Sequence, residues 1–118
     1  MTNIVLSVVL CLASWQTFTD KGKIAANGKP FDPSSMSCAS RQFPLGTHLR
    51  VTDIHNKSFV DVVVTDKPHK RFKNRIDLSP RAFKQLNGLE LGVCGVSVFP
   101  FLKSNSENCV KPFPKSFP

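Results

Sequence analysis

The sequence predicts a mainly β, turn-rich protein, and two observations support this fold class. Nine prolines and six glycines interrupt the 118 residues too often for a helical bundle. Between these turns lie short segments that alternate polar and apolar residues or carry runs of β-branched residues, as strands do. The length corresponds to one domain with a single hydrophobic core.

The strongest strand signal is the apolar, β-branched run at residues 60–66, which ends in an aspartate and is stopped by Pro68. Residues 48–54 alternate polar and apolar side chains, so they predict a partner strand. A turn at residues 55–57 would join the two strands into a β-hairpin. A second aspartate, Asp77, lies in a short apolar segment further along the chain. Strand ends and the loops after them commonly carry functional side chains, which makes both aspartates candidates.

A helix is predicted to follow Asp77. Ser79 suits the N-cap, Pro80 suits the first helical position, and the pair Asn87-Gly88 ends the pattern. Weaker signals predict a first strand at residues 13–18, a short helix or turn at 34–42 and a last strand at 92–102.

We divide the chain into residues 1–12, a domain at 13–102 and a proline-rich, loosely held tail at 103–118. The first segment is apolar with small residues at its end, like a signal peptide, but no Lys or Arg precedes it. The alternative is an extension of the first strand, and the segment is too short to span a membrane. An exported protein of the cell envelope or the secreted fraction is the expected localisation.

The formal charge of +8 predicts an anionic partner, such as nucleic acid, an anionic lipid surface or a cell wall. Much of the positive charge follows Asp66, in the basic run from Lys67 to Lys84. Nucleic acid is disfavoured because the chain lacks a recognisable binding motif and interleaved aromatic residues. We expect a monomer.

The cysteines and histidines predict no metal or other cofactor. The four cysteines are widely spaced without a CxxC pair, and the three histidines follow no metal-ligand spacing. In an exported chain, a disulfide between Cys94 and Cys109 would tie the tail to the last strand. Four free thiols are the alternative.

Several motifs, in this order and spacing, resemble the RlpA-like double-psi β-barrel family. They are Ala-Ser-Trp at 13–15, Ala-Asn-Gly-Lys-Pro-Phe-Asp at 26–32, Phe-Pro-Leu-Gly-Thr at 43–47, Leu-Arg-Val-Thr at 49–52, Val-Val-Val-Thr-Asp at 62–66 and Arg-Ile-Asp-Leu-Ser at 75–79. The resemblance implies a six-stranded double-psi β-barrel with one or two short helices. It also implies kinship with the lytic transglycosylases of bacterial cell walls, and more distantly with expansin and family-45 endoglucanase barrels.

The resemblance implies cleavage of the bond between N-acetylmuramic acid and N-acetylglucosamine in peptidoglycan by one catalytic aspartate. Asp66 matches the family's active-site aspartate, and Asp77 matches the aspartate of its Ile-Asp-Leu-Ser motif. Each has a simpler interpretation: Asp66 as a strand-end residue that binds backbone amides, and Asp77 as an organiser of a psi loop.

The substrate-binding candidates are Asp32, Lys29, Ser40, Trp15, Lys67 and Arg75. Two of them depart from the family pattern, since active members carry Glu at the position of Lys29 and His at that of Ser40. We therefore expect a transglycosylase of weak activity, with a non-catalytic, expansin-like binder of cell-wall glycan as the alternative. The partner in either case is peptidoglycan or a related anionic glycan.

Overall fold

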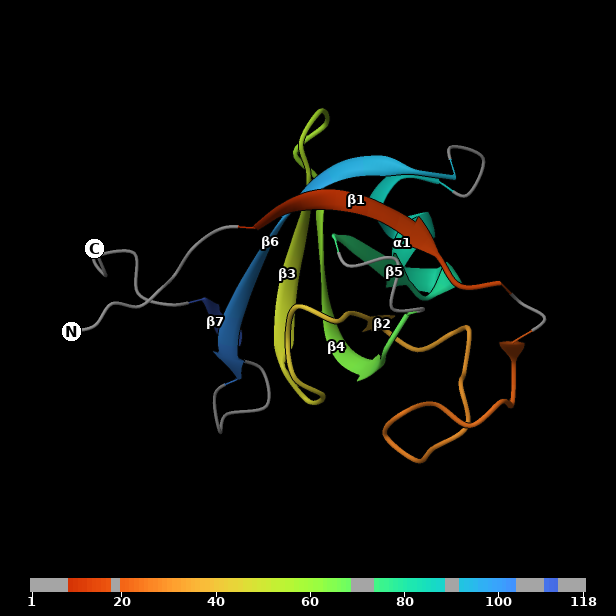
Figure 1. Ribbon diagram of the computed structural model, residues 1–118. Helices are drawn as coiled ribbons and strands as arrows, with labels where there is room; N and C mark the ends of the chain where they lie inside the picture. Colours follow the sequence, from red (N-terminus) through yellow and green to blue (C-terminus); the bar gives the residue numbers. More distant parts are fainter. Residues whose placement is uncertain (1–8, 18–19, 69–73, 89–91, 104–109, 113–118) are drawn as a thin grey trace.

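The computed structural model describes residues 9–17, 20–68, 74–88, 92–103 and 110–112 (Figure 1). The elements are β1 (Val9–Trp15), β2 (Ser37–Ala39), β3 (His48–Asp53), β4 (Phe59–Asp66), β5 (Arg75–Leu78), α1 (Pro80–Asn87), β6 (Cys94–Lys103) and β7 (Val110–Pro112). None of the described helical residues belongs to a helix with the length and apolar character needed to cross a membrane.

Six strands close into a barrel in the order β1-β5-β2-β4-β3-β6, and β6 pairs again with β1. Two of the pairings are parallel, β1 with β5 and β2 with β4, and the others are antiparallel. The predicted hairpin is confirmed as β3 and β4, and the mixed, closed barrel with a single short helix confirms the predicted fold class.

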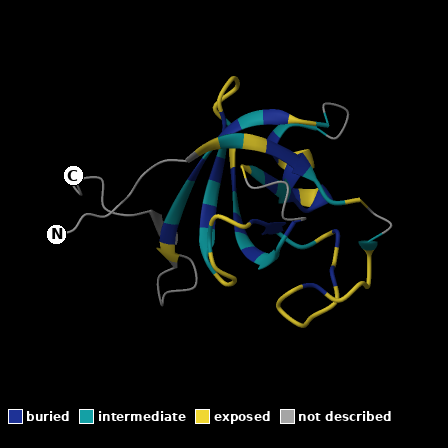
Figure 2. Cartoon of the chain, viewed as in Figure 1, coloured by how far each residue is buried: buried dark blue, intermediate teal, exposed yellow. Residues whose placement is uncertain are grey.

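The core lies inside the barrel because the strands alternate buried and outward-facing residues (Figure 2). On β4, Val60, Val62 and Val64 face inward. Helix α1 adds the buried side chains Ala82, Phe83 and Leu86 and contacts β1, β3, β4 and β5. Residues from nearly every element therefore share one apolar core.

Helix α1 begins as predicted from its capping residues. The Ser79 hydroxyl accepts a hydrogen bond from the Ala82 N–H at 3.3 Å and donates one to the Ser35 carbonyl at 2.5 Å. Pro80 occupies the first turn, and Gly88 follows the helix with φ of 81°. The cap therefore also ties α1 to the segment before β2.

Residues 34–42 were predicted to form a short helix or turn, and this prediction is wrong for Ser37–Ala39. These three residues form β2, which lies between β4 and β5 with all three side chains buried. A segment this short has no helical period of its own, so pairing with two neighbouring strands decides its conformation.

The predicted tail contains one short strand, Val110–Pro112. These residues form β7 on the edge of β6, paired with Phe101–Lys103. Strand β1 pairs with β6 only as far as Val98, so the remaining edge of β6 is open to another strand. Residues 104–109 and 113–118 lie outside the described residues.

The first strand starts at Val9, earlier than the predicted start at residue 13, and ends at Trp15. Residues 1–8, on which a signal-like interpretation also depends, lie outside the described residues. The structure records Cys11, Cys38 and Cys94 as free cysteines. Cys109, the predicted disulfide partner of Cys94, lies outside the described residues as well.

Candidate functional site

A β-bulge between β2 and β4 sets the direction of Asp66. Cys38 pairs with Val64, but the next residue, Ala39, pairs with Asp66, so Thr65 is an extra residue on β4. Val64 faces the core, and regular alternation would turn Asp66 inward as well. The bulge instead turns Asp66 toward the outer face, and bulges often redirect a side chain in this way.

Two backbone amides hold the Asp66 carboxylate. The N–H groups of Ala26 and Lys67 each donate to Oδ1 at 2.9 Å. Among the described residues, no hydrogen bond to Oδ2 is present. One carboxylate oxygen is thus fixed by the chain.

The backbone around Asp66 is fixed by residues that follow β2. The Ser40 N–H donates to the Asp66 carbonyl at 3.0 Å, and the Arg41 Nε donates to the Pro68 carbonyl at 2.7 Å. The Lys67 ammonium donates to the Phe43 carbonyl at 3.1 Å. These contacts place Lys67 beside Asp66 but engage its ammonium with the protein.

Ser40 is close to Asp66 through its backbone and not through its side chain. The side chain is buried, and its hydroxyl accepts a hydrogen bond from the Gln42 N–H at 3.1 Å. The hydroxyl therefore stabilises the turn after β2. Its predicted role in substrate binding remains a prediction.

Asp77 lies on β5, with its side chain between β1 and the outer surface. The Ser14 hydroxyl donates a short hydrogen bond to Oδ1, and Arg75 Nε is 3.9 Å from the same oxygen. Arg75 Nε also donates to the Ser14 hydroxyl at 3.1 Å. The group joins the parallel strands β1 and β5, where Ser14 and Asp77 are register partners.

The two aspartates lie at the same level of the barrel. Ala39 on β2 is the register partner of Asp66 on one side and of Asp77 on the other. Two strand spacings separate them, which corresponds to roughly 10 Å between their Cα atoms. The structure thus brings both predicted catalytic residues to one region of the outer face.

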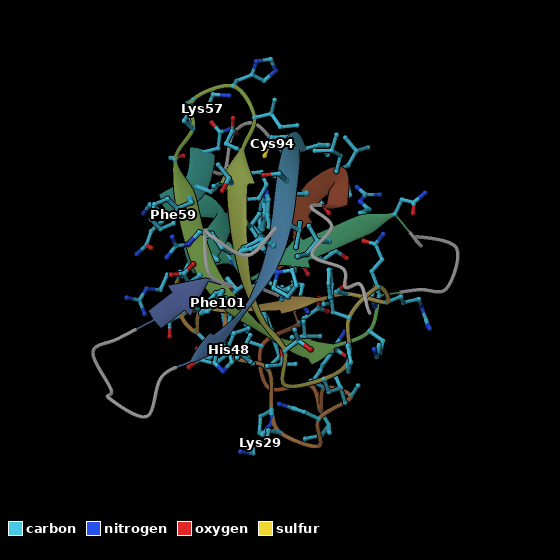
Figure 3. All side chains as sticks on the ribbon, turned by 90° about the vertical axis from the view of Figure 1, so that its left-hand side faces the viewer. Lys29, His48, Lys57, Phe59, Cys94 and Phe101 are labelled. Carbon is cyan, nitrogen blue, oxygen red and sulfur yellow. The ribbon has the colours of Figure 1, made fainter. Side chains whose placement is uncertain are left out.

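Lys29 and Asp32 lie in the long segment that covers β2 and β4. Both line a cavity of about 220 Å³ that also includes Thr65, the residue before Asp66. Lys29 is exposed at one end of the molecule, and Lys57, in the turn between β3 and β4, lies at the opposite end (Figure 3). The segment is attached to β4 by the Asn27 N–H, which donates to the Thr65 carbonyl at 3.1 Å.

The carboxylate of Asp32 is also held by its own loop. The backbone N–H and the hydroxyl of Ser34 donate to Oδ1 at 2.9 and 2.8 Å. These hydrogen bonds, the backbone one first, and the nearby charge of Lys21 lower the pKa of Asp32 below its ordinary value. Asp32 is therefore a carboxylate at neutral pH.

Trp15 ends β1 and is partly buried against the core. Its register partner is Leu78, one position beyond the Asp77 pair. The structure therefore places it beside the Asp77 group, and it does not line the cavity that includes Lys29.

Sequence reasoning missed Ser14 and the amide of Ala26 as partners of the aspartates. Both lie in motifs that were recognised, but their contacts depend on the parallel register of β1 with β5 and on the path of the segment before β2. It also missed the cations Lys21, Arg81 and Lys84 as members of one cavity. Among the described residues, no cluster of three or more potential ligands could hold a metal ion.

The fold is that of a double-psi β-barrel, and comparison with known proteins shows the family. A family model described as lytic transglycolase matches residues 12–98. The chain belongs to this family of RlpA-like double-psi β-barrels.

Among the relatives are proteins named endolytic peptidoglycan transglycosylase RlpA. The one from Pseudomonas aeruginosa is 36% identical over 86 residues, which is 73% of this chain and 25% of that protein. The one from Campylobacter jejuni is 32% identical over 99 residues, 82% of this chain and 36% of that protein. The chain thus spans only about a quarter to a third of the length of these relatives.

Solved structures show the same fold. The Streptomyces papain inhibitor is 27% identical with a TM-score of 0.66, and the match covers 82% of this chain and 97% of that one. The apo form of a Clavibacter michiganensis expansin is 24% identical with a TM-score of 0.68, covering 85% and 53%. A d78n mutant of this expansin in complex with cellohexaose is 22% identical with a TM-score of 0.66, and the match again covers 85% of this chain and 53% of that one.

Proposed function

We propose that the chain binds peptidoglycan glycan strands over the outer ends of β2 and β4. We further propose that it cleaves the bond between N-acetylmuramic acid and N-acetylglucosamine with Asp66 as the catalytic acid. The observation that carries the proposal is the Asp66 carboxylate, which a bulge directs outward and two amides hold through Oδ1. The RlpA relatives, which are named peptidoglycan transglycosylases, support the substrate and the reaction.

One carboxyl group is sufficient for this chemistry. The Asp66 carboxylic acid would protonate the glycosidic oxygen as the bond to the anomeric carbon breaks. The carboxylate would then accept the proton of the muramoyl O6 hydroxyl, whose oxygen attacks the anomeric carbon and closes a 1,6-anhydro ring. Water is not consumed, so the second carboxylate that glycoside hydrolysis requires is not needed.

Asp77 is the less suitable acid in this arrangement. Its Oδ1 already accepts the Ser14 hydroxyl and lies 3.9 Å from the Nε of Arg75, so the protein itself occupies this oxygen. Such a group stabilises the pairing of β1 with β5 and, in this proposal, forms one wall of the glycan site. Trp15, on the same side, would supply a partly exposed ring for contact with a sugar.

The test is digestion of purified sacculi, with the products followed by mass spectrometry. The wild-type protein should release 1,6-anhydromuramoyl products slowly, and Asp66→Asn should release none while still sedimenting with the sacculi. The matched control is Asp20→Asn, a carboxylate that pairs with Lys23 and lines neither cavity, which should release product like the wild type. An Asp66→Asn protein that releases product at the wild-type rate would exclude Asp66 as the acid.

A specific observation favours non-catalytic glycan binding as a second candidate. The positions where active family members carry Glu and His are occupied by Lys29, which is exposed, and by Ser40, whose buried hydroxyl is bonded to Gln42. Neither supplies a second acid or base to Asp66. Binding to sacculi without any anhydro product from the wild-type protein would support this candidate over the first.

A further inference from the structure

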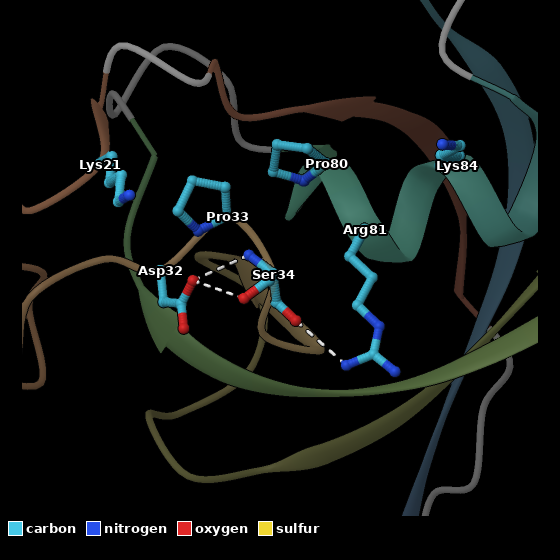
Figure 4. Close-up of a pocket in the computed structure, with 7 residues that line it drawn as sticks. All are labelled: Lys21, Asp32, Pro33, Ser34, Pro80, Arg81 and Lys84. Atoms are coloured by element: carbon cyan, nitrogen blue, oxygen red, sulfur yellow. Dashed lines mark hydrogen bonds between the residues drawn. The ribbon is translucent and has the colours of Figure 1, made fainter.

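A second cavity lies on the other side of the segment that covers β2 and β4, between this segment and α1. It has a volume of about 450 Å³ and is lined by Lys21, Asp32, Pro33, Ser34, Pro80, Arg81 and Lys84 (Figure 4). This volume lies within the usual range of small-molecule sites. Neither Asp66 nor Asp77 lines it.

The walls of this cavity are fixed to each other. The Arg81 N–H donates to the Pro33 carbonyl at 3.1 Å, and an Arg81 guanidinium nitrogen donates to the Ser34 carbonyl at 3.1 Å. Ser34 in turn holds Asp32 Oδ1 through its N–H and hydroxyl. The loop and the helix are therefore joined in one arrangement, as a preformed binding site requires.

Positive charge dominates the lining. Three cations, Lys21, Arg81 and Lys84, face one carboxylate, Asp32, which has one oxygen engaged by Ser34. Arg81 uses one nitrogen for the Ser34 carbonyl, and a guanidinium carries five N–H donors in all. The cavity thus suits a ligand with a carboxylate, since arginine and lysine form charge-assisted hydrogen bonds with this group.

The remaining wall is apolar. Pro33 and Pro80, the first residue of α1, lie between Lys21 and Arg81 (Figure 4). Both are buried, and Pro80 is less than 2% exposed. A flat apolar wall beside a few charged groups suits a ring that has one apolar face and one anionic substituent. A pyranose with a carboxylate has this composition, and the cavity volume accommodates a single sugar of this kind.

The cavity adjoins the Asp66 region through one shared residue. Asp32 lines both this cavity and the smaller one, and the smaller cavity reaches Thr65 beside Asp66. A polymer that crosses Asp66 can therefore reach the cationic cavity along the same segment.

We propose that the cavity between Asp32 and α1 is a subsite for an acidic sugar, a pyranose that carries a carboxylate. The carboxylate binds Arg81 and Lys84, and the ring packs against Pro33. The proposal rests on glycan binding at Asp66. It adds a second contact point, at which the protein recognises a negatively charged sugar of the glycan. The sugar acid is either the lactyl-bearing muramic unit of peptidoglycan without peptide or the uronic acid unit of another wall polymer.

The test is an NMR titration of the full chain, in which amide signals of Ser34 and Arg81 report on the cavity. The probes are N-acetylmuramic acid, glucuronic acid and, as the neutral sugar, N-acetylglucosamine. The acids should shift these signals, with Kd values at least about tenfold lower than that of the neutral sugar, the effect of about one charge-assisted contact. Tighter binding of the muramic probe assigns the subsite to peptidoglycan, and tighter binding of glucuronic acid assigns it to a uronic acid polymer.

Variants separate specific from general electrostatic binding. Lys84→Gln and Arg81→Gln should each raise the Kd of the acid by about threefold to tenfold. Lys23→Gln removes an equal charge from the loop that carries Asp32, but Lys23 pairs with Asp20 and does not line the cavity. The Kd of the acid should therefore be the same for this variant as for the wild type. Because Arg81 also ties the loop to α1, Lys84→Gln, which changes an exposed side chain, is the decisive variant.

Equal binding of the neutral sugar, or an equal loss with Lys23→Gln, would overturn the subsite. The result is independent of catalysis, since Asp66→Asn should bind the acids like the wild type. Loss of the anhydro product with acid binding retained would count against Asp66 alone. Retained product with no acid binding in this cavity would count against the subsite alone.

Discussion

Asp66 and Asp77 share a register position but are held by different kinds of partner. Asp66 accepts hydrogen bonds from the backbone, and one of its donors, the Ala26 N–H, lies at an exposed residue. Asp77 accepts the hydroxyl of buried Ser14 and lies near Arg75, so its partners are side chains on two strands. Asp66 can therefore exchange its hydrogen bonds for contacts with a ligand, whereas Asp77 is better suited to hold two strands together.

Asp77→Ala should therefore lower the free energy of unfolding by about 1–3 kcal/mol, because the Ser14 hydroxyl would lose its acceptor and Arg75 a nearby carboxylate at a partly buried position. Asp66→Ala should cost less, since water can replace the acceptor of the exposed Ala26 amide. Urea unfolding monitored by circular dichroism measures both values. Equal losses for the two variants would contradict the structural role assigned to Asp77.

The positions of both aspartates could be predicted from the sequence, but the direction of the Asp66 side chain could not. Residues 60–66 show a strand that ends in an acid, which places Asp66 at the strand end. The outward direction depends on the bulge opposite Ala39, and β2 was predicted to be a helix or a turn. A bulge arises from the pairing of two strands and leaves no mark in one of them.

At the level of elements, the turn between β3 and β4 depends on a residue that the hairpin pattern did not indicate. Asp53, the last residue of β3, is fully buried. Its Oδ1 accepts the N–H groups of His55 and Asn56 at 2.7 and 3.0 Å, and the Asn87 amide donates a short hydrogen bond to Oδ2. Asp53 thus shapes the turn and attaches it to the end of α1.

This burial and these hydrogen bonds act in opposite directions on the pKa of Asp53. Burial raises it, but the amides of Asn56 and His55 and the Cys94 thiol outweigh burial, so the pKa lies below its ordinary value. A carboxylate with a lowered pKa in the folded state contributes stability above the pKa of the unfolded chain, about 4. That contribution is lost as the pH falls through the lower, folded-state pKa.

Asp53→Asn should destabilise the protein by about 1–2 kcal/mol at pH 7, since it replaces a carboxylate in several hydrogen bonds by a neutral amide. The difference from the wild type should shrink below about pH 4, where the wild type loses the contribution of the ionised group. Urea unfolding at a series of pH values from 7 to acid measures this. A constant difference across the series would show that the charge of Asp53 does not stabilise the fold.

Some elements could be predicted because their signals are local. Ser79 and Pro80 mark the start of α1 whatever surrounds it, and the alternation in residues 48–54 indicates a strand with one buried face. β2 and β7 contain three residues each, too few for a period. Their conformation follows from the edges that β4, β5 and β6 offer them, which only the assembled barrel provides.

At the scale of the whole molecule, barrel closure joins strands that are far apart in the chain. β1 pairs with both β5 and β6, and the parallel register of β1 with β5 cannot come from a hairpin. Alternation and turn residues therefore predict a β protein, but they do not determine the order in which its strands pair. The order of motifs shared with the RlpA-like family supplied the topology, and the family match over residues 12–98 confirms the kinship.

The basic charge is also a property of the whole molecule. In the structure, some of the cations bind other parts of the protein, whereas others are exposed and line the cavities. Lys67, Arg75 and Arg81 each donate hydrogen bonds within the protein. Lys29 and Lys84 are exposed and line the two cavities that share Asp32. Residues 69–73, the centre of the predicted basic run, lie outside the described residues. Among the described cations, Lys29 and Lys84 are therefore the candidates for contact with the proposed anionic polymer.

Exposed charges interact through solvent, and about 0.1 M salt screens them beyond roughly 10 Å. Binding to sacculi should therefore weaken several-fold between low salt and 0.5 M salt, as measured by co-sedimentation. Chitin, a neutral glycan with similar sugars, should bind more weakly and with little salt dependence, because only contacts with the rings remain. Lys29→Gln combined with Lys84→Gln should reduce the salt dependence on sacculi, whereas Lys23→Gln with Lys57→Gln, an equal loss of charge outside the cavities, should leave it nearly unchanged. Sacculus binding that is equally strong at both salt concentrations would show that the positive charge does not hold the polymer.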